Sequence, residues 1–331
     1  MAVEHILDAA CLADASDIHL HAGRAPMLRL AGRVEVVDLE PVSQEELLWF
    51  LSHVATHESC EAFNTGREVD GAFSTSHGRW RLHAYYTEHG ASLALRRLPK
   101  VIPSLDELGI PPVARNLASL KQGLILVTGA TGSGKSTTAA SMLSLIGHSR
   151  ACHIVTIEDP IEYLFDFPRG LVSQREIQKH TDSFAQALRA ALREDPDVIF
   201  VGEMRDLETM RLALQAAETG HLVISTLHTA GASKTISRVV DVFPSDQQSL
   251  VRTVLAGAIE AIISQELVVA PSGKRVLVPE VLIGTPGVRA LIRDGKFHHI
   301  DHLMQTSLDV GMRTRACSLS MLHERLGLKI A

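Results

Sequence analysis

The residues best suited to chemistry lie between positions 129 and 137. Gly129 to Ser136 fits the phosphate-binding pattern G-x-x-x-x-G-K-[ST] without a mismatch. Glycines let successive backbone N–H groups turn toward phosphate oxygens, and a helix predicted over 137–146 adds the positive end of its dipole. Lys135 can reach the β- and γ-phosphates, and the Ser136 hydroxyl can ligate Mg²⁺. A glycine-rich turn could match by chance, but the predicted strand before it and the helix after it favour a site for ATP and Mg²⁺. The predicted nucleotide-binding residues are Gly129, Ala130, Thr131, Gly132, Ser133, Gly134, Lys135, Ser136 and Thr137.

Carboxylates follow two further predicted strands. Glu158 and Glu162 come directly after an apolar run over 153–157, and Glu203 follows the run that ends at Val201. Ligands of parallel sheets bind at the carboxyl ends of strands, where these side chains would meet the phosphates. An acidic loop could also be plain solvated surface. We predict that Glu203 is the main carboxylate facing Mg²⁺ and water, although Gly202 stands where an aspartate commonly precedes that glutamate. Glu158 is a second candidate metal ligand.

One histidine occupies a similar position. His228 lies just beyond the strand predicted over 221–225, at the same edge of the sheet. A lone histidine there is more often structural, but this one accompanies three other polar strand ends. We therefore interpret His228 as a candidate sensor of the γ-phosphate.

Arginines alternate with apolar residues in an earlier segment. In the run over 79–83, Trp80 and Leu82 share one face of a predicted strand, whereas Arg81 and its polar neighbours share the other. Such a face is usually solvated. Alternatively Arg81, with Arg96 on the next predicted strand, contacts the nucleotide of this or a neighbouring subunit. Arginine fingers accelerate phosphoryl transfer by roughly 10³ to 10⁵, but spacing alone favours the solvated face.

Length and element pattern predict two domains. The chain has 331 residues, and domains average roughly 150. Residues 1–98 show helices and a meander of short strands, which predicts a small α+β domain; Ser43 and Glu46 form a capping box within it. Residues 99–104, bracketed by prolines, are a predicted hinge. Residues 105–331 alternate apolar strands with helices, which predicts an α/β domain with a mostly parallel sheet.

Two helices are predicted near the C-terminal end. The first is long and amphipathic, over 249–266. The second runs from an N-cap at Thr285 to a stop at Gly295, with Arg289 and Arg293 on one face. Those two arginines belong either to a solvated helix or to a partner-facing surface.

Composition limits the function classes. The net charge of −6 argues against a nucleic-acid partner held by bulk electrostatics. No apolar run is long enough to cross a bilayer, and residues 1–5 do not resemble the start of a signal peptide. The four cysteines lie far apart without a C-x-x-C pair, so they predict reduced thiols and not a zinc site. We expect a cytoplasmic protein.

Taken together, these motifs resemble the secretion ATPase superfamily, and most of all its type IV pilus retraction ATPases. The resemblance runs from Ala15–Leu20 through the phosphate-binding loop and continues in four more motifs. These are Thr156–Glu162, Gly202–Asp206, Gly220–Thr229 and Thr285–Asp294. It departs in the last of them, where Gly287 and Ala290 replace the alanine and asparagine usual in retraction ATPases; the glycine should cost up to about 1 kcal/mol of local helix stability. It also departs at Thr87–Gly90, which lacks a usual arginine.

The resemblance implies an N-terminal PAS-like domain joined to a RecA-like ATPase domain, assembled as a homohexamer. It implies that Glu162 is the general base that activates water, that Glu203 is the Walker B glutamate, and that Arg81 and Arg96 reach the nucleotide. The implied partners are an inner-membrane platform protein and the pilus base, with membrane association through these partners only, at the inner face of the cytoplasmic membrane.

Alternatives remain within and outside this superfamily. An accessory pilus motor is the nearest. Assembly and type II secretion ATPases generally carry an extra N-terminal domain and a four-cysteine zinc module, which we do not find in this sequence. A subunit that binds ATP as a switch without hydrolysing it is a different class, and retention of Lys135, Glu162 and Glu203 argues against it. A small-molecule kinase fits the phosphate-binding loop but not the other motifs.

Overall fold

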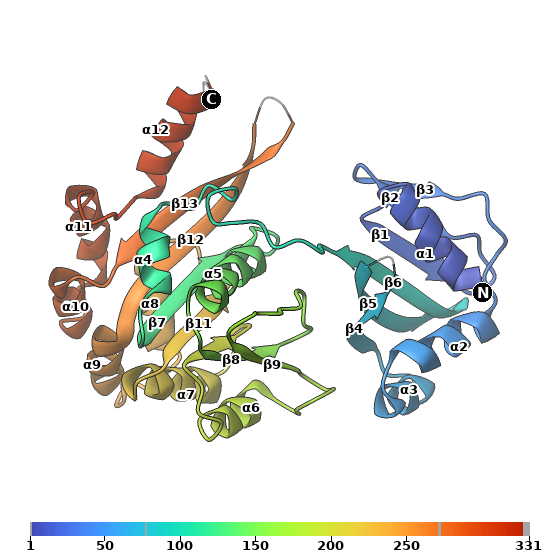
Figure 1. Ribbon diagram of the computed structural model, residues 1–331, viewed down its shortest axis with the longest axis horizontal. Coiled ribbons are helices and arrows are strands. Elements are labelled where there is room, and N and C mark those ends of the chain that lie inside the picture. Colours follow the sequence, from blue (N-terminus) through green and yellow to red (C-terminus); the bar gives the residue numbers. More distant parts are fainter. Residues whose placement is uncertain (1, 77, 271–272, 327–331) are drawn as a thin grey trace. The chain divides into compact units, whose positions relative to one another are not determined.

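The chain forms two compact units in a computed structural model that describes residues 2–76, 78–270 and 273–326 (Figure 1). The first unit comprises residues 1–101 together with 159–164, and the second comprises 102–158 together with 165–331. The short acidic segment 159–164 is therefore grouped with the first unit, although its neighbours in sequence belong to the second. No described helix is long and apolar enough to span a membrane.

The first unit is an antiparallel sheet with helices packed on one face. Its six strands have the order β3-β2-β1-β6-β5-β4. The strands are β1 (Asp17–His21), β2 (Met27–Leu30), β3 (Arg33–Val36), β4 (Val69–Thr75), β5 (Gly78–Thr87) and β6 (Gly90–Leu98). The helices are α1 (Ala2–Leu12), α2 (Gln44–Val54) and α3 (His57–Asn64), and apolar side chains of α1, α2 and α3 share one core with the sheet. The predicted capping box at the start of α2 is confirmed. Trp80 and Leu82 are buried, as the period-two alternation predicted.

Charged side chains form a row across the sheet of the first unit. Arg29, Asp17, Arg96 and Arg81 occupy directly paired positions on β2, β1, β6 and β5. Arg96 Nε donates to Asp17 Oδ1 at 2.8 Å, and Arg29 Nε lies 3.7 Å from Asp17 Oδ2. Arg81 Nη2 lies 4.0 Å from Asp70 Oδ1. Both candidate arginines therefore contact acidic residues of their own sheet.

The second unit is an α/β layer structure, which confirms the predicted fold class. Its seven strands have the order β13-β12-β7-β11-β10-β8-β9, and β13 alone among the described strands of this sheet is antiparallel to its neighbour. The strands are β7 (Gly123–Gly129), β8 (His153–Glu158), β9 (Leu171–Glu176), β10 (Val198–Val201), β11 (Leu222–Leu227), β12 (Ile259–Val269) and β13 (Arg275–Ile283).

Helices cover both faces of this sheet. α4 (Val113–Ala118) and α5 (Lys135–Ser149) share one core with alternate residues of the central strands. A second core on the opposite face involves α6 (Phe184–Ala191), α7 (Leu207–Glu218), α8 (Ala232–Asp241), α9 (Gln248–Ala258), α10 (Pro286–Arg293) and α11 (Ile300–Thr306). A 3₁₀ turn, η1 (Phe297–His299), precedes α11, and α12 (Arg315–Leu326) follows it. Neighbouring residues of β7, such as Leu124 and Ile125, enter different cores, as expected for a strand buried on both sides.

The helix predicted over 249–266 is wrong in its second half. α9 ends at Ala258, and residues from Ile259 onward form β12 between β7 and β13. A strand buried on both faces gives a continuous apolar run without period-two alternation, which periodicity cannot distinguish from a buried helix. Pairing with β7 decides the outcome, and it brings β12 alongside the phosphate-binding loop.

The second predicted C-terminal helix forms as α10, with Thr285 as its N-cap. We expected the two arginines of this helix to lie either on a solvated face or on a partner-facing surface. Arg289 does neither, because its guanidinium points inward. Arg289 Nε donates to the Gly284 carbonyl at 2.7 Å, Nη1 to the Ala256 carbonyl at 2.9 Å, and Nη2 pairs with Glu260 at 2.7 Å. The side chain is only 20% exposed. Arg289 thus ties α10 to the C-terminal end of α9, while Arg293 is exposed.

Asp17→Asn should lower the free energy of unfolding of the first unit and make that free energy depend less on pH in the acid range. Burial raises the pKa of Asp17, but hydrogen bonds from Arg96 and Ser16 and the charges of Arg96 and Arg29 outweigh it, so the pKa is lowered on folding. This contribution is present above the unfolded-state pKa and is lost as the pH falls through the folded-state pKa. At neutral pH we expect a loss of about 1–3 kcal/mol in the free energy of unfolding, measured with urea at several pH values.

Asp14→Asn is the matched control, because Asp14 pairs with Arg97 but is 96% exposed. Its effect should stay within about 0.5 kcal/mol. An Asp17→Asn protein whose unfolding free energy varies with acid pH as in the parent would contradict the role assigned to Asp17.

Candidate functional site

The polar strand ends meet at one edge of the seven-stranded sheet. Thr128 on β7 pairs with Leu227 on β11, and Val201 on β10 pairs with both Ser225 on β11 and Ile157 on β8. These strands end at or lead into the phosphate-binding loop, His228, Glu203 and Glu158, all within the second unit. Parallel pairing in register therefore gathers, at one edge, segments separated by up to about a hundred positions in the sequence.

The phosphate-binding loop has the backbone of an anion cradle. Gly132 and Gly134 adopt left-handed conformations, with φ of +78° and +88°. Gly129 has φ of +143°, and a Cβ there would lie 2.3 Å from the Gln265 carbonyl oxygen. α5 begins at Lys135 without a side-chain cap, so the first N–H groups of a 15-residue helix face the loop. Glycine backbone, uncapped helix start and lysine together fit a bound polyphosphate.

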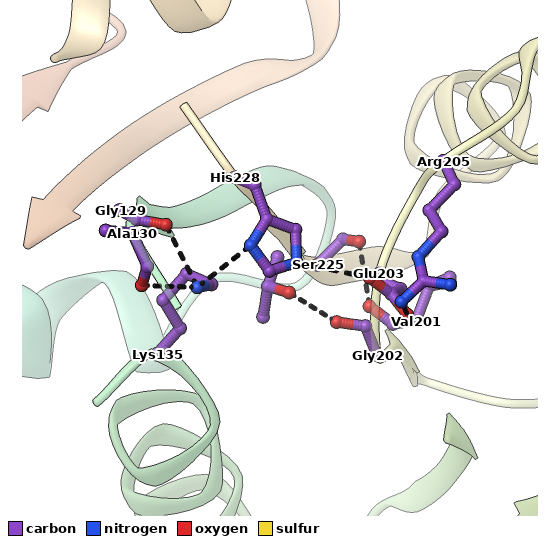
Figure 2. Close-up of polar contacts among 10 residues, drawn as sticks. Gly129, Ala130, Lys135, Val201, Gly202, Glu203, Arg205, Ser225 and His228 are labelled. Carbon is purple, nitrogen blue, oxygen red and sulfur yellow. Dashed lines mark hydrogen bonds and ion pairs between the residues drawn. The ribbon is translucent and has the colours of Figure 1, made fainter. Parts of the chain in front are cut away.

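Lys135, His228 and Glu203 form a connected network at this loop (Figure 2). Lys135 Nζ donates to the carbonyls of Gly129 and Ala130 at 3.0 and 2.9 Å, and lies 3.5 Å from His228 Nδ1. His228 Nε2 lies 3.3 Å from Glu203 Oε2. The His228 imidazole therefore lies between the Lys135 ammonium and the carboxylate of Glu203, which follows β10. Three of the predicted catalytic residues, Lys135, His228 and Glu203, are therefore connected.

Arg205 completes the environment of Glu203. Its Nη2 lies 2.6 Å from Glu203 Oε1, so both carboxylate oxygens have a cationic or protonatable neighbour. The Glu203 side chain is only 12% exposed, whereas Arg205 is 71% exposed. A carboxylate held at both oxygens keeps a defined orientation. Arg205 lies two positions after Glu203 and was not predicted, because spacing alone does not show that its side chain turns back.

Gly202 has a packing reason to replace the expected aspartate. A Cβ at this position would lie 3.1 Å from the Ile157 carbonyl oxygen and 3.4 Å from Glu158 Cα. Gly202 N also donates to that carbonyl at 2.8 Å, and Thr226 Oγ1 donates to the Gly202 carbonyl at 2.5 Å. The backbone before Glu203 is thus held on both sides, so a side chain at position 202 would require the neighbouring backbone to shift by a few tenths of an ångström.

Glu158 lies on the neighbouring strand and is buried. Its Oε1 accepts hydrogen bonds from Thr156 Oγ1 at 2.7 Å and from Gln174 Nε2 at 3.2 Å. Thr156 is two positions earlier on the same strand, so strand periodicity could have identified it. Glu162 belongs to the first unit with Arg81 and Arg96, and in that unit Arg79 Nε donates to the Ile161 carbonyl at 2.8 Å. The catalytic roles of Glu162, Arg81 and Arg96 stay predictions.

The residues present also fit a divalent cation bound with a nucleotide. The Ser136 hydroxyl has no hydrogen-bond partner among the described residues. Glu158 ends β8 and Glu203 follows the adjacent strand β10, and both supply carboxylate oxygens of the kind Mg²⁺ prefers. Within the described ranges, no group of three or more His, Cys, Asp or Glu side chains is placed to hold a metal by itself. Ligation by Ser136, Glu158 and Glu203 stays a prediction.

Gln265 is a neighbour of the loop that the sequence did not reveal. Its Nε2 donates to Thr138 Oγ1 on α5 at 2.6 Å, and Gln265 pairs with Gly129 in the β12–β7 register. Both side chains are buried. The predicted helix over 249–266 hid this contact, because only a strand brings Gln265 beside Gly129.

The comparisons with known proteins agree with this geometry. A family model described as "Type II/IV secretion system protein" matches residues 1–325. The type IV pilus retraction ATPase PilT of Pseudomonas aeruginosa is 44% identical over 301 residues, which cover 91% of this chain and 88% of that protein. The uncharacterized protein YggR of Escherichia coli is 46% identical over 317 residues, covering 95% and 96%. A crystal structure of the pilus retraction motor PilT with bound ADP superposes with a TM-score of 0.91 at 45% identity, over 98% of this chain and 94% of that one.

Gly129→Ala should destabilise the loop and weaken nucleotide binding. The added Cβ meets backbone at 2.3 Å, and φ of +143° strains any L side chain. Such strain costs of order 1–3 kcal/mol, and each 1.4 kcal/mol lost from binding is about tenfold in affinity. We expect a lower midpoint of urea unfolding and a nucleotide affinity weakened by about tenfold or more, by titration with a fluorescent ATP analogue.

Gly257→Ala is the control, because a Cβ there meets nothing within 4 Å in helix α9. It should leave affinity unchanged and stabilise the helix by up to about 1 kcal/mol. Equal nucleotide affinity in the two variants would contradict the close approach at Gly129.

Proposed function

The chain belongs to the type II/IV secretion system protein family, and from its similarity to retraction ATPases we propose that it is an ATP-driven motor that retracts type IV pili. It is an ATPase of this family. The observation that carries the proposal is the Lys135–His228–Glu203 network at the phosphate-binding loop, within a fold that matches a retraction motor along nearly its whole length.

Each residue of the network has a distinct task in the proposed hydrolysis. The Lys135 ammonium now donates to neutral carbonyls of its own loop. Phosphate oxygens are charged acceptors and form stronger hydrogen bonds, so the ammonium would favour them over these carbonyls. Glu203 orients the attacking water, while Arg205 and His228 hold its carboxylate. His228 lies between Glu203 and Lys135, so it is placed to respond when a nucleotide phosphate binds in the loop.

Further roles rest on the family resemblance. Glu162 takes the proton from the attacking water, and Arg81 and Arg96 contact the nucleotide. From their places in the phosphate-binding loop and at the strand ends, Ser136, Glu158 and Glu203 would hold Mg²⁺, which when bound neutralises charge that develops on the phosphates. The same resemblance supports a homohexamer that acts in the cytoplasm on an inner-membrane platform protein at the pilus base.

Glu203→Gln should abolish ATP turnover without abolishing ATP binding. The substitution keeps the size of the side chain but removes its negative charge, which both Arg205 and His228 approach. We expect kcat to fall by about 10²-fold or more in a steady-state phosphate-release assay. Glu208→Gln is the matched control, because Glu208 forms a half-exposed ion pair with Arg189 on the surface. Turnover that survives in Glu203→Gln would contradict the assignment, and a parent protein without turnover would favour a nucleotide-binding switch.

Deletion of the gene tests the cellular function. We expect more surface pili and no retraction events by live imaging of labelled pili, with rescue by the parent chain but not by Lys135→Ala. Lys135 is chosen because it lies in the loop that binds phosphate. Cells without pili would contradict retraction and indicate an assembly ATPase. Unchanged piliation and retraction would indicate an accessory motor or another pilus-like machine.

A further inference from the structure

One carboxylate of the second unit serves two helix starts. Glu280 lies on β13, directly opposite Ser264 on β12. Its Oε1 accepts a hydrogen bond from the Ala232 N–H at 2.7 Å, at the first residue of α8. Its Oε2 accepts from the Arg315 N–H at 3.3 Å, at the first residue of α12. The negative charge of Glu280 therefore stabilises the positive ends of two helices at once.

The α8 side of this bridge leads back to the nucleotide site. α8 begins at Ala232, four positions after His228. Gly231, at the N-cap, has no side chain to cap the helix, and instead its N–H donates to Ser264 Oγ at 2.9 Å. Thr229 Oγ1 lies 2.7 Å from Thr235 Oγ1. The loop that carries His228 is thus attached at its far end to Ser264 and Glu280.

The α12 side is attached to the same short stretch of β13. Val281 N donates to the Arg313 carbonyl at 2.7 Å, and Arg313 N donates back at 2.9 Å. The Ser318 hydroxyl donates to the Pro279 carbonyl. Three successive residues, from Pro279 to Val281, therefore hold the beginning of α12, and Glu280 alone among these three also holds α8.

We propose that Glu280 is a positioning residue that couples the His228 loop to α12, so that nucleotide binding changes how the first turn of α12 is held. A shift of the His228 loop that moves the Ala232 N–H also moves Glu280 Oε1, which accepts its hydrogen bond. The other oxygen of the same rigid carboxylate, Oε2, accepts from the Arg315 N–H, so the movement reaches the first turn of α12. This inference rests on nucleotide binding at the proposed site but does not depend on pilus retraction. It gives the C-terminal helix a means of responding to the nucleotide state.

Hydrogen exchange of the full-length protein tests the coupling. Backbone protection of the segment 313–319 is measured with and without a saturating non-hydrolysable ATP analogue. In the parent we expect the analogue to change the exchange rate of this segment by about fivefold. In Glu280→Gln the analogue should still bind, but the change should vanish, because an amide offers one oxygen acceptor and cannot hold both helices. A change that persists in Glu280→Gln would overturn the coupling.

Glu266→Gln is the matched control. Glu266 Oε2 contacts the Arg315 side chain at 2.5 Å, but it accepts neither helix-start N–H. Hydrogen bonding to Arg315 lowers the pKa of Glu266, so this variant loses a charge at the same helix start and leaves Glu280 in place. It should keep the nucleotide-dependent change. If Glu266→Gln loses the nucleotide-dependent exchange change as fully as Glu280→Gln does, the effect depends on negative charge near α12. The two hydrogen bonds of Glu280 would then not be its cause, which would overturn the proposal.

A double-mutant cycle separates coupling from mere destabilisation. Ser318→Ala removes the hydroxyl that holds α12 to the Pro279 carbonyl and leaves Glu280 in place. Because coupling is reciprocal, Ser318→Ala should shift analogue affinity by about twofold or more in the parent and leave it unchanged in Glu280→Gln. Equal effects in both backgrounds would overturn the proposal.

The parent protein separates failure of the function from failure of the coupling. Failure of the parent to bind the analogue would contradict the proposed function itself, and with it the coupling. Binding without any response of α12 would contradict the coupling alone.

Discussion

The site depends above all on the parallel pairing of β7, β11, β10 and β8. Each strand is almost fully buried, so its backbone must pair with its neighbours, and the register cannot slip without moving apolar side chains between the two cores. This constraint fixes the strand ends at one edge. Lys135, His228 and Glu203 meet there as a consequence, since each lies at or just beyond the end of one of these strands.

β12 gives the same edge its support. Its residues Ser264, Gln265 and Glu266 contact, in turn, the start of α8, the helix after the phosphate-binding loop, and the start of α12. Gly129 has no side chain because the Gln265 carbonyl occupies the space. The nucleotide site, the His228 loop and the C-terminal helix therefore share three consecutive positions of one strand.

Local signals in the sequence were sufficient where one short segment carries the information. The phosphate-binding pattern, the capping box of α2, the N-cap Thr285, and the alternation around Trp80 all correspond to structure. The signals failed where partners are distant. The helix predicted beyond Ala258 is a strand because β7 and β13 flank it, and Arg289 turns inward because carbonyls at the end of α9 lie within its reach.

The sequence by itself determined the class of chemistry, ATP hydrolysis, because the glycines, Lys135 and Ser136 of the phosphate-binding loop lie within one short segment at 129–136. Tertiary structure decided how these groups are held. Arg205 on Glu203, Gln265 beside Gly129, and Glu280 between two helix starts are contacts that depend on register, on strand order and on side chains that turn back. No spacing rule encodes these contacts. Those of Gln265 and Glu280 join distant segments that only folding brings within hydrogen-bond distance, and that of Arg205 depends on the direction in which its side chain turns.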